Sequence, residues 1–262
     1  MWMVLAGAIA LAPAWLAAQT AAPAIGVVVM HGKGGAPTKH VADLASQLQS
    51  QGFLVANLDM PWSGRREYDV DVAAAEAEVE TAMAALRKAG AQKIFVAGHS
   101  QGGLFALYFG GKHAVDGVVA MAPGGHTGNI TYREKLGDTV DRARQQLASG
   151  KGQEKQPFQD FETARGIYPV VTTAHNYLSW FDPEGAMNQA KALKALPATL
   201  PVLWIAPTGD YPGLLKVKQQ MVDALPKNPQ TRVLEPTTSH LGAPSAAVPS
   251  IVEWTRKVAA GQ

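Results

Sequence analysis

Residues 98–102 read Gly-His-Ser-Gln-Gly, which places Ser100 between two glycines with the spacing Gly-x-Ser-x-Gly. The apolar residues 93–97 before it predict a buried parallel strand, and residues 103–109 after it predict a buried helix. A serine at such a strand-to-helix turn is exposed as a nucleophile, and its strained backbone requires neighbours without side chains. The turn also brings the Gln101 N–H beside the hydroxyl, where an oxyanion would form.

A serine hydroxyl needs a base to remove its proton, and the base needs a carboxylate to orient it. Around turns of this kind the three groups follow along the chain in the order Ser, acid, His. Loops at the carboxyl ends of parallel strands can reach such a site. Asp210 follows the predicted strand 201–206, and His240 lies in the loop after the predicted strand 231–234. The sequence therefore predicts a catalytic triad of Ser100, Asp210 and His240.

Taken singly, Asp210 and His240 have ordinary explanations. An aspartate after a strand is usually a helix cap or a turn residue, and a loop histidine is usually solvated. Their combination with the serine turn, in the required order and at the required strand ends, favours catalysis. Asp182 is a less suitable acid because it lies in a long insertion, and His99 is expected to point away from the Ser100 hydroxyl.

Residues 31–35 read His-Gly-Lys-Gly-Gly and directly follow the predicted strand 25–30. A glycine-rich loop there lets a backbone N–H approach the oxyanion, and the predicted donor is Lys33, with Gly34 as the alternative. The loop lacks the spacing of a phosphate-binding loop. A metal site built on His31 and His40 would lack a convincing third ligand, so we predict no metal there.

Composition restricts the class of protein. The 262 residues suit one sizeable α/β domain, and 47% hydrophobic with 17% charged residues is typical of a globular chain. Lys and Arg are scattered and the formal net charge is +2, so no nucleic-acid partner is predicted. The absence of cysteine excludes disulfides, a cysteine nucleophile and thiolate metal sites.

Residues 1–24 resemble a secretory signal peptide, with an uncharged apolar stretch followed by small residues. The alternatives are a buried N-terminal helix and a membrane anchor. Pro13 opposes the helix, and about 18 interrupted apolar residues only marginally span a bilayer. We therefore expect a periplasmic or secreted protein whose mature form has no stable membrane span.

From residue 25 to 262, short apolar runs alternate with amphipathic stretches, which predicts a mostly parallel sheet of about six strands with helices on both faces. The predicted strands are 25–30, 53–58, 93–97, 117–121, 201–206 and 231–234. The connection 124–188 is too long for an ordinary crossover, so we predict an inserted lid there.

Aromatic residues gather in the second half of the insertion. We predict that Tyr177, Trp180 and Phe181, together with Trp62 across the cleft, line an apolar substrate pocket. The alternative is that these rings anchor the returning chain to the sheet.

The motifs at 31–32, 59–64, 98–102, 209–210 and His240 together resemble those of the α/β-hydrolase fold superfamily, of the serine esterase and lipase type. The resemblance covers about residue 25 to the C-terminus. It implies hydrolysis of a small-molecule carboxylic ester through an acyl-enzyme, without a cofactor, on a sheet that has eight strands in the family and six here. Peptidases, thioesterases and cofactor-free haloperoxidases share this triad, and a non-catalytic binding protein could share the fold.

Overall fold

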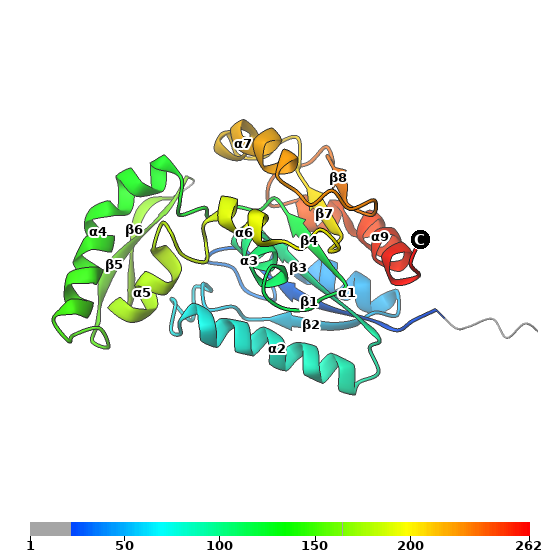
Figure 1. The fold of residues 1–262 in the computed structure, drawn as a ribbon, viewed down its shortest axis with the longest axis horizontal. Helices are drawn as coiled ribbons and strands as arrows, with labels where there is room; N and C mark the ends of the chain where they lie inside the picture. The colour runs from blue at the N-terminus through cyan, green and yellow to red at the C-terminus, as the bar shows by residue number, and fades with distance from the viewer. Residues whose placement is uncertain (1–21, 164) are drawn as a thin grey trace, which may run out of the picture.

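The computed structural model describes residues 22–163 and 165–262, and its centre is a parallel sheet with strand order β2-β1-β3-β4-β7-β8 (Figure 1). Residues 1–21 of the predicted signal segment, 1–24, lie outside the described residues. The strands are β1 (Ile25–Met30), β2 (Leu54–Leu58), β3 (Lys93–His99), β4 (Gly117–Met121), β7 (Val202–Ile205) and β8 (Arg232–Leu234). Each agrees with a predicted strand to within two residues at either end, so the predicted parallel sheet of about six strands with helices on both faces is confirmed.

Helices cover both faces of the sheet because successive strand residues point to opposite faces and both sets are apolar. Val27 and Val29 of β1 pack against one group of helices, whereas Val28 and Met30 pack against the other. The first group is α1 (Ala42–Ser50) and α9 (Val248–Ala259), preceded by the short α8 (Ala243–Ala246). The second group is α2 (Val72–Lys88), α3 (Gln101–Gly110), α6 (Gln189–Ala195) and α7 (Pro212–Asp223).

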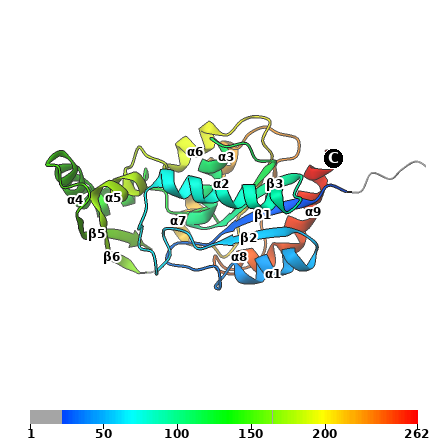
Figure 2. The ribbon, with the colours of Figure 1, turned by 90° about the horizontal axis from the view of Figure 1, so that it is seen from below.

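The segment predicted as a lid forms a small unit of its own between β4 and β7, beyond one end of the sheet (Figures 1 and 2). It contains α4 (Ile130–Ala148), β5 (Lys155–Glu162), β6 (Gly166–Thr173) and α5 (Ala174–Phe181). We call these residues, 130–181, the insertion. Its two strands pair antiparallel, with Pro157 opposite Val171. This hairpin is not predicted from the sequence, and the action of the insertion as a lid stays a prediction.

Alternation of burial along the hairpin explains how the insertion packs. Phe158, Asp160 and Val170 point inward, whereas Gln159 and Val171 on the opposite face are exposed. The inward face packs against α4 and α5 and against the main domain. Among the described residues, no helix combines the length and the apolar character needed to cross a membrane.

Candidate active site

The turn between β3 and α3 holds Ser100 in a strained conformation, with φ +54° and ψ −118°. The two flanking glycines make this conformation possible. A Cβ atom on Gly98 would overlap the backbone of Gly102, and one on Gly102 would lie 2.5 Å from the carbonyl oxygen of Met30. Side chains are therefore excluded on both sides of the turn, as the spacing Gly-x-Ser-x-Gly predicts.

Asp210 and His240 are brought together by the loops that follow β7 and β8. The Gly209 N–H donates to the Thr238 carbonyl at 3.0 Å, so the two loops run side by side as far as these residues. His240 Nδ1 lies 2.7 Å from Asp210 Oδ1, and both side chains are almost completely buried. A carboxylate in this position holds Nδ1 protonated and leaves Nε2 free to accept a proton.

Ser100 is linked to His240 through its neighbour. The His99 Nε2–H donates to the backbone carbonyl of His240 at 2.9 Å, and the two imidazole rings lie 4.8 Å apart. The direct bond from Ser100 Oγ to His240 Nε2 stays a prediction, since catalytic contacts in unliganded enzymes are often long. The sequence predicts only that His99 points away from the hydroxyl, and its bond to the His240 loop was missed.

The buried state of His99 makes stability depend on pH. Burial, reinforced by the neighbouring His240, lowers the pKa of His99 to about 3. Between the ordinary histidine pKa of ~6.5 and this value, the unfolded chain binds a proton that the folded chain does not. We therefore expect the free energy of unfolding to fall as the pH is lowered through this window, by an amount on the order of a few kcal/mol.

The measurement is urea unfolding at several pH values between 7 and 4, for the wild type and for His99→Gln. The glutamine does not titrate, so the variant should lose less stability over this interval, whatever its stability at pH 7. Buried His31 and half-buried His126, whose pKa values are also lowered by burial, are present in both proteins, so the difference between the two pH dependences reports mainly on His99. Parallel pH dependences would contradict the assignment to His99.

The glycine-rich loop after β1 is shaped by His31. Its Nδ1–H donates to the Gly32 carbonyl at 2.7 Å, and its Nε2 accepts the Met60 N–H at 3.0 Å. The Gly34 N–H, the alternative oxyanion donor, already donates to the Trp62 carbonyl at 2.9 Å. Within the described parts of the chain, neither Lys33 nor Gln101 donates a hydrogen bond from its backbone N–H. The geometry therefore favours these two groups as the oxyanion donors.

The four aromatic residues predicted to line a substrate pocket are instead in the interior. Trp62, Tyr177, Trp180 and Phe181 are each at most 3% exposed and belong to one core cluster. The Trp62 and Trp180 rings meet edge to face at 5.5 Å, and Tyr177 stacks on Phe181 at 4.4 Å. These positions favour the anchoring role.

The anchoring role predicts a large effect on stability. Trp180 fills a space between Trp62, Phe105 and Tyr68, and its Nε1–H donates to the Val70 carbonyl at 2.8 Å. We expect Trp180→Ala to lower the free energy of unfolding by about 3–5 kcal/mol, because it leaves a cavity and an unpaired carbonyl.

Chemical denaturation measures this change, and Ile130→Ala is the matched control. Ile130 lies in the same insertion but is 68% exposed, so its truncation should change stability by less than about 0.5 kcal/mol. A Trp180→Ala variant of normal stability with altered substrate preference would show that the ring contacts substrate instead.

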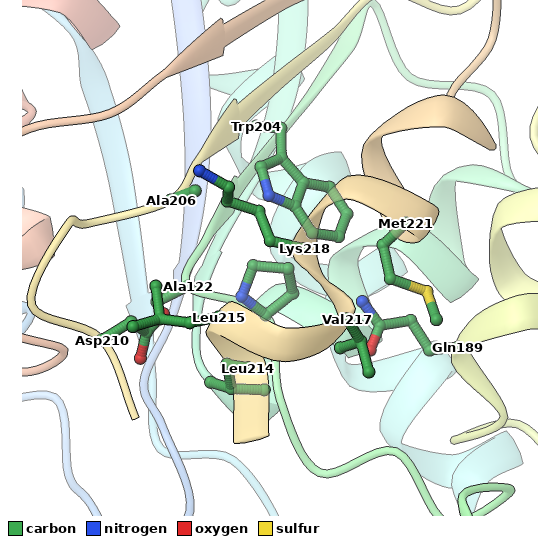
Figure 3. A pocket seen from close by; sticks show the side chains of 11 residues that line it. Ala122, Gln189, Trp204, Ala206, Asp210, Leu214, Leu215, Val217, Lys218 and Met221 are labelled. Carbon is green, nitrogen blue, oxygen red and sulfur yellow. The ribbon is translucent and has the colours of Figure 1, made fainter. Parts of the chain in front are cut away.

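A small pocket lies beside the candidate triad, between α7 and the ends of β4 and β7 (Figure 3). Its volume is about 20 Å³, on the scale of a single water molecule. Asp210 and Leu214 line it, and Gln189 contributes a buried amide nitrogen that has no partner among the described residues. A Cβ atom on Gly124 would lie 3.6 Å from both Ser100 Oγ and a Leu214 methyl group, so the wall beside the hydroxyl is apolar.

Tyr211 is a second neighbour of the site that the sequence did not single out. Its ring lies 4.4 Å from the imidazole of His240, and its N–H donates to Asp210 Oδ1 at 2.7 Å. A position next to the acid in the sequence was the only signal that could have found it. In the described parts of the chain, no three His, Cys, Asp or Glu residues are grouped so that they could hold a metal ion.

Comparison with known families identifies the fold. The sequence model of the α/β-hydrolase fold matches residues 27–207, which include most of β1, the serine turn and β7. The chain belongs to the α/β-hydrolase fold family. No curated protein matches the sequence of this hydrolase-fold chain.

Solved structures resemble the α/β-hydrolase chain over nearly its whole length. DcsB, solved in complex with a substrate analogue, has 18% sequence identity and a TM-score of 0.67, covering 92% of each chain. The monoacylglycerol lipase of Paleococcus ferrophilus has 19% identity and a TM-score of 0.61, covering 89% of this chain and 94% of its own. A carboxyl esterase of Bacillus coagulans has 14% identity and a TM-score of 0.62, covering 90% and 91%. At these identities the likeness shows the fold.

Proposed function

We propose that this protein is a serine hydrolase that cleaves carboxylic esters through an acyl-enzyme intermediate. The observation that carries the proposal is the 2.7 Å contact between His240 and Asp210, on loops that meet beside the strained Ser100 turn. A buried carboxylate that orients an imidazole next to such a serine is the arrangement that activates a hydroxyl.

In the first half of the reaction, Ser100 Oγ attacks the carbonyl carbon of the ester and transfers its proton to His240 Nε2. The carbonyl oxygen becomes negatively charged and accepts hydrogen bonds from the Lys33 and Gln101 N–H groups. The carbon–oxygen bond to the alcohol then breaks, and His240 returns the proton to the leaving oxygen. In the second half, water attacks the acyl-serine by the same steps.

Two of the similar structures, the monoacylglycerol lipase and the carboxyl esterase, bear names that denote ester hydrolysis, which supports an ester substrate here. Wall residues such as Leu214 and Gly124 place apolar surface beside the nucleophile. An apolar surface of this kind suits the acyl or alcohol part of a small-molecule ester.

The test is a kinetic comparison of p-nitrophenyl esters of increasing chain length with the corresponding thioesters and aminoacyl-anilides. Preferred hydrolysis of the esters supports the proposal. Preferred hydrolysis of the anilides would make the protein a peptidase, and preference for the thioesters a thioesterase. No turnover of any of them would favour a non-catalytic binding protein.

We also propose export to the periplasm or the medium, on the basis of the apolar segment 1–24. Expression of the full chain followed by N-terminal sequencing of the exported protein tests this. A mature protein that begins between residues 19 and 25 supports export, whereas an intact N-terminus on intracellular protein contradicts it.

A further inference from the structure

The side chain of Lys33 does not point into solvent but into the insertion. Its ammonium group lies 2.6 Å from Asp160 Oδ1 and donates to the Tyr132 hydroxyl at 3.0 Å and the Phe161 carbonyl at 3.3 Å. The Lys33 side chain is 9% exposed and Asp160 is completely buried. Every donor of the ammonium group therefore has an acceptor, and all three acceptors belong to the insertion.

Asp160 joins this lysine to a second part of the site. Its Oδ2 accepts hydrogen bonds from the hydroxyls of Tyr68, at 3.1 Å, and Tyr168, at 2.9 Å. The Tyr68 hydroxyl also lies 3.3 Å from Gln101 Oε1. Asp160 thus contacts the Lys33 side chain directly and reaches the Gln101 side chain only through Tyr68. The backbone N–H groups of Lys33 and Gln101 are the two candidate oxyanion donors.

Tyr68 enters this network at a conformational cost. Its backbone has φ +57°, in the left-handed region that bulky residues rarely adopt. Such strain persists only where the surroundings hold the residue in place. Here they include the hydrogen bond that its hydroxyl donates to Asp160, and its carbonyl accepts from the Thr172 hydroxyl at 2.7 Å.

We propose that Asp160, from the insertion, is a positioning residue of the oxyanion hole. It holds the Lys33 and Gln101 side chains so that both backbone N–H groups face the hydroxyl of Ser100. The inference rests on the proposed function and adds to it a residue that lies outside the triad and the glycine-rich loop.

The ion pair is strong enough to fix the loop. Burial by itself lowers the pKa of Lys33, but the carboxylate of Asp160 outweighs it and raises the pKa above its ordinary value. Removing one partner of a buried pair leaves an uncompensated charge, so the two side chains cannot separate without a large penalty. Because Gly32, Gly34 and Gly35 flank Lys33 and offer no side chains, its ammonium group is the only side-chain anchor at the centre of the loop.

The expected effect is on the chemical step. A donor misplaced by about 1 Å costs on the order of 100-fold in rate, while ground-state binding of an ester hardly uses the hole. We expect Asp160→Asn to lower kcat by about 10- to 100-fold with KM changed by less than about twofold, and Asp160→Glu to restore part of kcat. The rate of phosphonate labelling of Ser100 should fall with kcat.

The double variant Lys33→Met with Asp160→Asn removes both charges and provides a folded comparison if the single variant is unstable. It should lose kcat to the same extent as Asp160→Asn, because both variants remove the same anchor. Glu184→Gln is the matched control. Glu184 is an exposed carboxylate just after the insertion, paired with Arg133 at 2.7 Å, and its change should leave kcat unaltered.

Rates are compared on protein shown to be folded by thermal melting, and crystal structures of the wild type and Asp160→Asn give the position of the Lys33 N–H. Unchanged kcat in the folded variants, or a loss confined to KM, would overturn the proposal. If the wild type hydrolyses no ester and is not covalently labelled by a phosphonate, the proposed function is overturned. The two crystal structures would still test the positioning role in that case. A Lys33 N–H displaced in Asp160→Asn relative to the wild type supports it, and an unmoved N–H contradicts it.

Discussion

Replacing Ser100 with alanine is expected to lower kcat for p-nitrophenyl ester hydrolysis by at least about 10⁴-fold. The variant removes the only atom that forms the covalent bond, whereas the oxyanion donors and the binding surface remain. Serine and alanine share the Cβ atom, so the strain at φ +54° is the same in both and the melting temperature should stay nearly unchanged. Steady-state kinetics and a thermal melt on the same preparation measure both quantities.

A serine elsewhere provides the control. Ser50, at the exposed end of α1, can be changed to alanine without touching the site, and its variant should keep the wild-type kcat. If Ser100→Ala retains a tenth or more of the activity, another residue is the nucleophile and the proposed mechanism is wrong.

Replacing Asp210 with asparagine is expected to lower kcat by as much as ~10⁴-fold. The amide has the same shape as the carboxylate but can offer its N–H₂ to His240 Nδ1, which then carries its proton on Nε2 and cannot accept one from Ser100. Tyr211 N–H and His240 Nδ1 both bond to the same Asp210 oxygen, so an amide N–H₂ at that position also loses the hydrogen bond from Tyr211. One such bond contributes about 1 kcal/mol, so the main effect should appear in kcat, with only a small loss of stability.

Asp182→Asn is the informative comparison, because Asp182 is the acid that would take the role if Asp210 did not. In the structure it caps the end of α5 and its Oδ2 lies 3.3 Å from Arg144, away from His240. We expect this variant to be fully active. The reverse pattern, an active Asp210→Asn and an inactive Asp182→Asn, would move the acid into the loop after α5.

Residues of the main sheet were predictable from the sequence because their pattern is local. The six residues of β1 are all apolar or glycine and all buried, as expected of a central parallel strand between two helical layers. Ser100, Asp210 and His240 each follow the end of a predicted strand. These site residues could therefore be named without knowledge of three-dimensional contacts. The insertion lacked such a pattern. Pro157 and Pro169 interrupt both strands of its hairpin, and proline normally argues against a strand.

Contacts between side chains far apart in the chain could not be predicted from the sequence. Lys33 and Asp160 are separated by 127 positions, and nothing in either neighbourhood distinguishes a buried ion pair from two solvated charges. His99 and His240 are 141 positions apart, and only the fold shows that one ring supports the backbone of the other. Similarly, the aromatic residues near 180 suit a pocket or a core equally well until their exposure is known.

The central claim is that Ser100 is an activated nucleophile, and labelling with a fluorophosphonate tests it most directly. Intact mass spectrometry followed by peptide mapping should show one adduct per chain, on Ser100 in the wild type. The label should be absent from Ser100→Ala and slow to appear in Asp210→Asn. An unlabelled wild type, or an adduct on any other residue, would contradict the account.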